Sequence, residues 1–178
     1  SFIESFPLFG YDLKDYDELF AEKLDLLLRI IQNERITWKG KHRSPINNMG
    51  IYPRPLQQPL PVWVAVGGTP QSVIRAATYG LPLAIAIIGG SPDNFIPLAQ
   101  LYRDTWQKAG HDESKLQLCV HAHGYIADTS QQAAAEFPSY QYVMTQLGKE
   151  RGWPPMSRQQ FEAMRSMKGS LLVGSIQE

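Results

Sequence analysis

The 178-residue chain carries 17 basic and 17 acidic side chains, so its formal net charge is zero. It is 43% hydrophobic and 19% charged, an ordinary balance for a globular protein, and it offers no electrostatic footprint for nucleic acid or an anionic membrane. The single cysteine, Cys119, excludes an intrachain disulfide framework and fits a reducing compartment. Because its longest apolar runs are too short to cross a bilayer, we expect a cytoplasmic protein without membrane contact.

The first part of the chain predicts one helix followed by an irregular segment. Asp15 and Glu18 form a helix start signal, and apolar residues recur at helical spacing over about residues 16–33. Glu18 and Glu22 are expected on the solvent face of this helix. Residues 34–61 contain several prolines and glycines, so we expect an irregular excursion there.

The rest of the chain alternates between strand and helix patterns. The expected strands cover about residues 62–66, 83–88, 116–126 and 171–173, and the expected helices cover about 70–79, 92–109, 130–150 and 157–167. Strands that alternate with helices indicate a parallel sheet, and the continuous apolar runs of the first two strands indicate that both faces are covered.

This order predicts an α/β fold of the (β/α)8 TIM-barrel type, with the chain covering roughly the C-terminal half of the barrel as a single domain, residues 1–178. A full barrel typically needs eight strands and about 250 residues. We therefore expect that the native protein is longer and that the sequence is incomplete at both ends. A doubly wound open sheet is the alternative, although the G-x-G-x-x-G fingerprint of dinucleotide binding is absent.

Two glycine turns follow the first two predicted strands of this sheet. Gly67-Gly68-Thr69 ends the first strand, and Pro70 opens a helix whose N–H groups and dipole favour an anion. Gly89-Gly90 repeats this turn, but Asp93 follows it, and a carboxylate there would repel phosphate. The first turn is therefore the better phosphate site, and the second is expected to form a wall of the barrel mouth.

Two histidines lie on the third predicted strand. Residues 117, 119, 121 and 123 alternate with an apolar set that should pack against helices, so His121 and His123 are expected to face the barrel interior, with His123 nearest the mouth. His123 could then contact the ligand or transfer protons, while hydrogen-bonded interior histidines are the plainer interpretation. His-x-His also suits a metal, but no nearby acid or histidine completes a ligand set, so none is expected.

The run Tyr52-Pro53-Arg54-Pro55-Leu56-Gln57-Gln58-Pro59-Leu60-Pro61, with Val62 to Thr69 after it, resembles the luciferase-like monooxygenase superfamily of flavin-dependent oxidoreductases. The segment Trp38-Lys39-Gly40-Lys41-His42 resembles a W-x-G-x-H/Y segment of that family, and Val173-Gly174-Ser175 resembles its late glycine turn. The resemblance runs in order over about residues 11–178.

The resemblance implies a β/α barrel that binds reduced FMN, or the deazaflavin F420, at the carboxyl ends of its strands. Gly67, Gly68 and Thr69 would form the flavin-phosphate turn, Gly89 and Gly90 would lie beside the cofactor, and Ser1 would supply another phosphate hydroxyl. The early strands of the family have no counterpart in these residues, so we expect the chain alone to be inactive.

The implied function is a flavin-dependent monooxygenase that uses O2 on a small organic substrate, with a separate flavin reductase as a plausible partner. The alternatives are an F420-dependent dehydrogenase and a flavin- or phosphate-binding barrel without turnover. We also expect a homo-oligomer.

Overall fold

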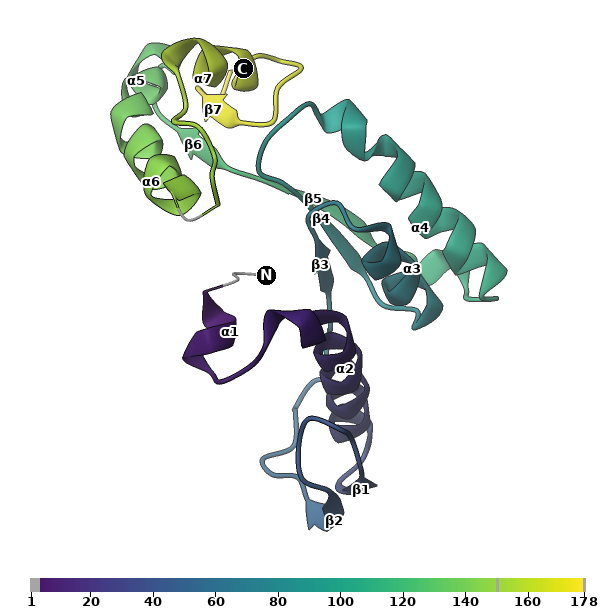
Figure 1. The fold of residues 1–178 in the computed structure, drawn as a ribbon. Helices are drawn as coiled ribbons and strands as arrows, with labels where there is room; N and C mark the ends of the chain where they lie inside the picture. Colours follow the sequence, from purple (N-terminus) through teal and green to yellow (C-terminus); the bar gives the residue numbers. More distant parts are fainter. Residues whose placement is uncertain (1–3, 150, 178) are drawn as a thin grey trace. The chain divides into compact units, whose positions relative to one another are not determined.

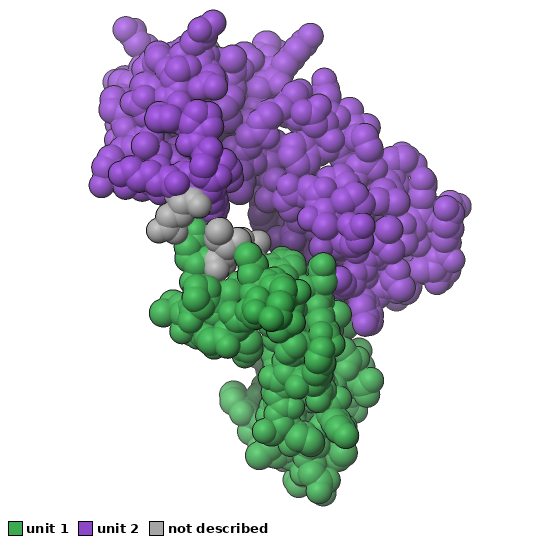
Figure 2. Space-filling view, viewed as in Figure 1, with its two compact units in different colours: residues 1–61 green, residues 62–178 purple. Residues whose placement is uncertain are grey.

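The computed structural model describes residues 4–149 and 151–177, and these fall into two compact units. The first unit covers residues 1–61 and the second covers residues 62–178 (Figure 2). Each unit has its own secondary structure (Figure 1). The expectation that residues 1–178 form one domain stays a prediction.

The first unit contains the expected helix and an unexpected pair of strands. Its elements are α1 (Ser5–Leu8), η1 (Leu13–Asp15), α2 (Tyr16–Gln32), β1 (Arg35–Trp38) and β2 (Ile46–Gly50). The strands β1 and β2 pair antiparallel, so the expectation of an irregular segment over residues 34–61 is wrong in its first half. The physical reason is local: Ile36 and Trp38 alternate with exposed residues and pack, with Ile46, against Leu26 of α2.

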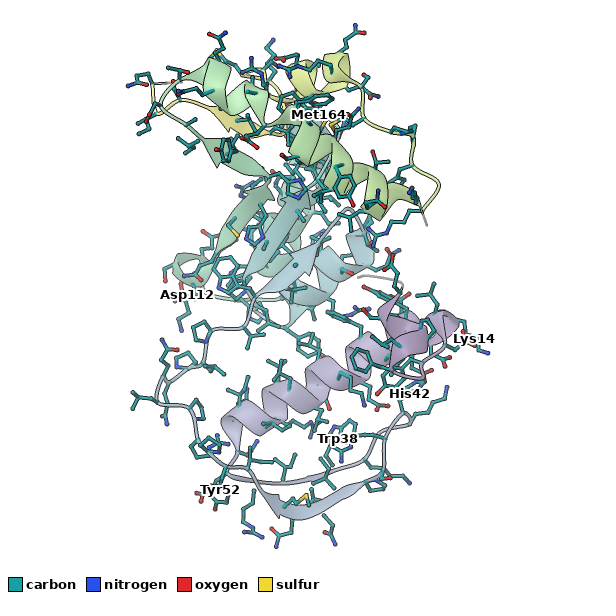
Figure 3. The ribbon with its side chains drawn as sticks, turned by 90° about the vertical axis from the view of Figure 1, so that its left-hand side faces the viewer. Lys14, Trp38, His42, Tyr52, Asp112 and Met164 are labelled. Atoms are coloured by element: carbon teal, nitrogen blue, oxygen red, sulfur yellow. The ribbon has the colours of Figure 1, made fainter. Side chains whose placement is uncertain are left out.

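Hydrogen bonds from the end of β1 and from the loop after it attach this part of the chain to α2. The Trp38 indole donates to Asp25 at 2.8 Å, and the Glu22 carboxylate accepts from the backbone N–H groups of Lys41 and His42 (Figure 3). A Cβ at Gly40 would overlap the Trp38 ring and the Glu22 carboxyl group. The Glu22 side chain is only 9% exposed, so placing it on the solvent face was wrong.

The second unit is built on the expected parallel sheet. Its first three strands, in the order β3 (Val64–Val66), β4 (Leu83–Ile87) and β5 (Leu118–Ala122), are paired parallel. Residue Val66 pairs with Ile85, and Ile85 pairs with Val120, so these side chains share one face of the sheet. The helices α3 (Pro70–Thr78) and α4 (Ile96–Lys108) lie side by side, and η2 (Pro92–Phe95) precedes α4 (Figure 1).

The expected strand over residues 116–126 is divided into two at His123. β5 ends at Ala122 and pairs with β4, whereas β6 (Gly124–Ile126) pairs with β7 (Leu172–Gly174), also in parallel (Figure 1). The His123 carbonyl accepts a hydrogen bond from the Leu172 N–H at 2.9 Å. The alternation of side chains continues through this change of partner, which is why the sequence predicts one strand. The mixed α/β class with parallel pairing is confirmed.

The remaining helices form a cluster around β6 and β7. They are α5 (Ser130–Ala135), α6 (Phe137–Lys149) and α7 (Arg158–Met164), and the short η3 (Glu113–Lys115) precedes β5. Their core contains Ala134, Phe137, Phe161 and Leu171. Thr129 with Gln132 forms a capping box at the start of α5, and Ser157 with Gln160 forms one at the start of α7. The helical segments expected over about residues 130–150 are α5 and α6.

Tyr102 of α4 joins the two segments that lead into β4 and β5. Its side chain is fully buried, and its hydroxyl donates toward the carbonyl oxygens of Leu81 at 2.9 Å and Gln117 at 3.2 Å. Burial raises the pKa of Tyr102 from 10.0 to about 12. Because the pKa is higher in the folded state, its stabilising contribution is complete below pH 10.0 and is lost as the pH rises through about 12.

We expect Tyr102→Phe to lower the free energy of unfolding near neutral pH by about 1–3 kcal/mol, because the Leu81 carbonyl loses its hydroxyl donor. The Gln117 carbonyl keeps a second donor, the Leu83 N–H. The variant should also lose less stability than the wild type between pH 10.0 and about 12. Chemical denaturation across this pH range measures both effects. Tyr79→Phe is the control, because the Tyr79 side chain is 46% exposed. Equal pH slopes in wild type and Tyr102→Phe would contradict the assignment.

Candidate functional site

The carboxyl ends of β3 and β4 open into one cavity. Because the two strands are parallel neighbours, the turns that follow them lie at the same edge of the sheet. Gly67, directly after β3, and Gly89, just beyond β4, both line a cavity of about 530 Å³. Ala86 of β4 and Ile88, the residue directly after β4, continue this wall. The structure thus brings together two of the predicted site residues.

The opposite wall comes from residues far along the chain. It is formed by η2, α6, α7 and the loop between these last two helices, through Phe95, Met144, Trp153, Pro154, Met156, Gln160, Ala163 and Met164. Figure 3 labels Met164 on α7. None of the described residues that line the cavity carries a charge, and their polar side-chain groups are the Gln160 amide and the Trp153 indole N–H. The cavity therefore favours an uncharged and largely apolar molecule.

The first glycine turn has the geometry of an anion site beside this cavity. Gly68 has a φ of +136°, a backbone conformation that glycine adopts far more readily than other residues. Thr69 is the N-cap of α3 and makes no side-chain capping hydrogen bond, and the first turn of α3 has no acidic residue. A Cβ at Gly67 or at Gly68 would meet no described atom within 4 Å, so the approach is open. This arrangement can accept a phosphate.

The second glycine turn differs from the first in its charge. Gly90 has a φ of +80°, and Asp93 lies in the first turn of η2. A carboxylate at this position opposes an incoming anion. Gly89 lines the cavity, whereas Gly68, Thr69 and Gly90 are not among its described lining residues. The difference between the two turns favours the first as the phosphate site and the second as a wall.

His123 is held by a tyrosine of α6. Its Nδ1 lies 2.9 Å from the Tyr140 hydroxyl, and the two rings meet edge to face. Burial raises the pKa of Tyr140, so its phenol stays neutral near pH 7. Tyr140 also packs against Phe161 and Met156, and Met156 lines the cavity. His123 itself is exposed and is not among the described residues that line the cavity, and Tyr140 links it to the Phe161 cluster on which Met156 also packs.

The other residues of this strand have different surroundings from those expected. His121 is exposed, and its side chain makes no hydrogen bond with the residues that the structure describes, so it is not a buried interior histidine here. Leu118, Val120 and Ala122 line a second cavity of about 420 Å³, together with Ile85 and Ile87. Val120 is 58% exposed, so the apolar set is not fully covered by helices as expected. Ser1 lies outside the described residues.

Within residues 4–149 and 151–177, no group of three or more histidine, cysteine, aspartate or glutamate side chains is placed to hold a metal ion. In the same part of the chain, no helix combines the length and the apolar character needed to cross a bilayer.

The α6–α7 wall was missed by sequence reasoning. Helical periodicity identifies the apolar side of these helices but does not indicate what that side faces. Two local signals were nonetheless present: the capping box Ser157-x-x-Gln160, which fixes the start of α7, and the segment Trp153-Pro154-Pro155, which places a large aromatic residue in a stiff connection.

Comparisons with known proteins agree with this fold. A sequence profile of the luciferase-like monooxygenase family matches residues 3–174. No curated protein gives a significant match. Among solved structures, the monooxygenase RslO1 from Streptomyces bottropensis superimposes with a TM-score of 0.75 at 20% identity, over 98% of this chain and 51% of that protein.

Two further solved structures carry ligands. An F420-dependent secondary alcohol dehydrogenase, solved with an F420-acetone adduct, gives a TM-score of 0.61 at 15% identity over 78% of this chain and 42% of its own. The other is the oxygenating constituent of 3,6-diketocamphane monooxygenase from Pseudomonas putida, a type II Baeyer-Villiger monooxygenase solved with FMN. It gives a TM-score of 0.50 at 18% identity, over 89% of this chain and 50% of its own. The chain spans about half the length of these proteins.

Proposed function

The chain belongs to the luciferase-like monooxygenase family, and we propose that the protein is a flavin-dependent oxidoreductase, a monooxygenase that uses reduced FMN and O2 on a small organic substrate. The observation that carries this proposal is the meeting of Gly67 and Gly89 at one apolar cavity, directly beside a helix N-terminus without acidic residues. Such a pair of features suits a ligand with a phosphate at one end and a flat apolar body at the other.

The residues present fit this cofactor. Gly67, Gly68 and Thr69 would hold the phosphate through backbone N–H groups and a hydroxyl, since the turn is open and its helix carries no opposing charge. Gly89 and Gly90 would let the second turn approach the cofactor closely, because neither has a Cβ. When bound, reduced FMN supplies the electrons for the reaction with O2.

The protein's own contribution would be to orient the reactants and to exclude water. The apolar cavity walls replace water around the reacting atoms, which strengthens electrostatic interactions there. His123 is the proposed proton donor or acceptor, and Tyr140 would fix the orientation of its imidazole through the 2.9 Å hydrogen bond.

For the whole protein we propose a (β/α)8 barrel, with residues 1–178 forming the C-terminal half as one domain. The parallel pairings of β3 with β4, β4 with β5 and β6 with β7 support this proposal, as does the coverage of 51% of the RslO1 monooxygenase. A cytoplasmic homo-oligomer that receives reduced flavin from a separate reductase remains our expectation.

A dehydrogenase that uses F420 is the second candidate, because the fold also resembles that of an F420-dependent secondary alcohol dehydrogenase. The two reactions differ in their oxidant. A monooxygenase consumes O2, whereas a dehydrogenase transfers a hydride from its substrate to F420 and consumes no O2.

One experiment tests both candidates and the possibility of a barrel without turnover. FMN and F420 are titrated against the full-length protein, and O2 consumption with reduced FMN is then followed with and without candidate substrates. Tight FMN binding with substrate-dependent O2 consumption supports the monooxygenase. Binding of F420, together with substrate-dependent reduction of F420 in the absence of O2, supports the dehydrogenase. Cofactor binding without either reaction would contradict both candidate functions.

A further inference from the structure

Gln160, an exposed residue at the cavity wall, has a side chain whose orientation is fixed by hydrogen bonds. The Gln160 side-chain oxygen accepts a hydrogen bond from the Ser157 backbone N–H at 2.8 Å, while the Ser157 hydroxyl accepts from the Gln160 N–H at 3.2 Å. This reciprocal pair is the capping box of α7, and it holds the amide of Gln160 at the cavity wall.

The orientation of the amide leaves a donor available. Because Ser157 N–H can only donate, the atom facing it is the amide oxygen, and the NH2 group points away from that bond. Among the described residues, none accepts a hydrogen bond from this NH2 group. Among the described lining residues, Gln160 therefore offers a donor that its capping box orients, Trp153 offers an indole N–H, and none carries a charged side chain.

The surrounding walls restrict the ligand further. Three thioethers, from Met144, Met156 and Met164, and two aromatic rings, from Phe95 and Trp153, line the cavity. Sulfur atoms and ring faces make favourable contacts with flat, polarisable rings, and a charged ligand would be desolvated without a partner. The volume of about 530 Å³ is of the size that holds a small organic molecule.

We propose that Gln160 determines substrate specificity: its NH2 group donates to an acceptor oxygen on an uncharged, otherwise apolar ring compound bound in this cavity. The inference rests on the proposed function for its description of this compound as a substrate. Its physical content, that Gln160 selects ligands with an acceptor oxygen, is independent of the cofactor.

The test uses a pair of variants that separates capping from ligand recognition. Gln160→Glu keeps an oxygen for the Ser157 N–H, and Ser-x-x-Glu is itself a capping box, but the donor facing the cavity becomes an acceptor. Gln160→Met removes the donor without adding a charge. Gln132→Glu is the control: it makes the same glutamine-to-glutamate change in the capping box of Thr129, and Gln132 is not among the described residues that line the cavity.

The probes are 2-acetylnaphthalene, which has an acceptor oxygen, and 2-isopropylnaphthalene, which has the same shape without one. Both are titrated calorimetrically against flavin-free full-length protein, and FMN and F420 are titrated against the same preparation. We expect the ketone-to-hydrocarbon affinity ratio to fall about 10-fold in Gln160→Glu and about 5-fold in Gln160→Met, and to stay within about 2-fold in Gln132→Glu.

The outcomes distinguish this inference from the proposed function. An unchanged ratio in both Gln160 variants, or no binding of either probe to the wild type, would overturn the role of Gln160. A fall in the ratio in a protein that binds neither FMN nor F420 would support ligand selection by Gln160 and contradict the oxidoreductase. A fall in the ratio together with cofactor binding supports both.

Discussion

Replacement of Gly68 with aspartate is expected to weaken FMN binding by about 30- to 150-fold, the equivalent of one or two lost charge-assisted hydrogen bonds. The new carboxylate would lie at the N-terminus of α3, whose first turn has no acidic residue. There it would repel the phosphate and compete with it for the positive end of the helix dipole. Titration of FMN by fluorescence quenching, in the full-length protein, measures the change.

Two matched variants isolate the charge from the backbone. Gly68→Ala tests the cost of a side chain at a φ of +136°, and it should weaken binding much less than Gly68→Asp. Gly90→Asp places the same residue in the second turn, also at a positive φ, where Asp93 already opposes an anion. Equal losses at positions 68 and 90 would move the phosphate away from the first turn.

The second large effect is expected at His123. If its imidazole transfers a proton in the reaction, His123→Ala should lower kcat by about 100-fold or more, as is typical for a general acid or base. Thermal stability should change little, because His123 is exposed and its loss removes one hydrogen bond and one edge-to-face ring contact, both with Tyr140. Steady-state kinetics and melting temperature are measured on the same preparation.

His121→Ala is the control for this prediction. It removes the same side chain two residues earlier on the strand, from an exposed position without a hydrogen bond among the described residues, so both kcat and stability should be nearly unchanged. Tyr140→Phe keeps the imidazole but removes its partner, and it should retain part of the rate that His123→Ala loses. Normal turnover in His123→Ala would leave His123 with a structural role only.

The order of strands and helices in the second unit could be predicted because its signals are local. Val64 to Val66 and Leu83 to Ile87 are continuous apolar runs, each followed by paired glycines and then a helix. Parallel pairing follows from that alternation alone. The glycine turns could be placed at one edge for the same reason, and Gly67 and Gly89 do meet at the cavity.

The parts that were not predicted depend on contacts between distant residues. Ile36 and Trp38 form a strand because they pack on α2 and pair with β2, and the prolines and glycines nearby obscured that short alternation. Glu22 appeared to be a solvent-facing acid because its partners, two backbone N–H groups, lie about 20 residues away and carry no sequence signal. The cavity wall of α6 and α7 could not be predicted for the same reason.

Side chains alternate between the two faces of the sheet along β4 and the residue after it, so consecutive residues line different cavities. Ala86 and Ile88 line the cavity at the glycine turns, whereas Ile85 and Ile87 line the second cavity, on the other side of the strand. Positions on this stretch that line the cavity at the glycine turns thus alternate with positions that line the second cavity, and Phe95 of η2 lines both. Natural selection can therefore change what such a protein binds one residue at a time, while its descendants inherit the same sheet.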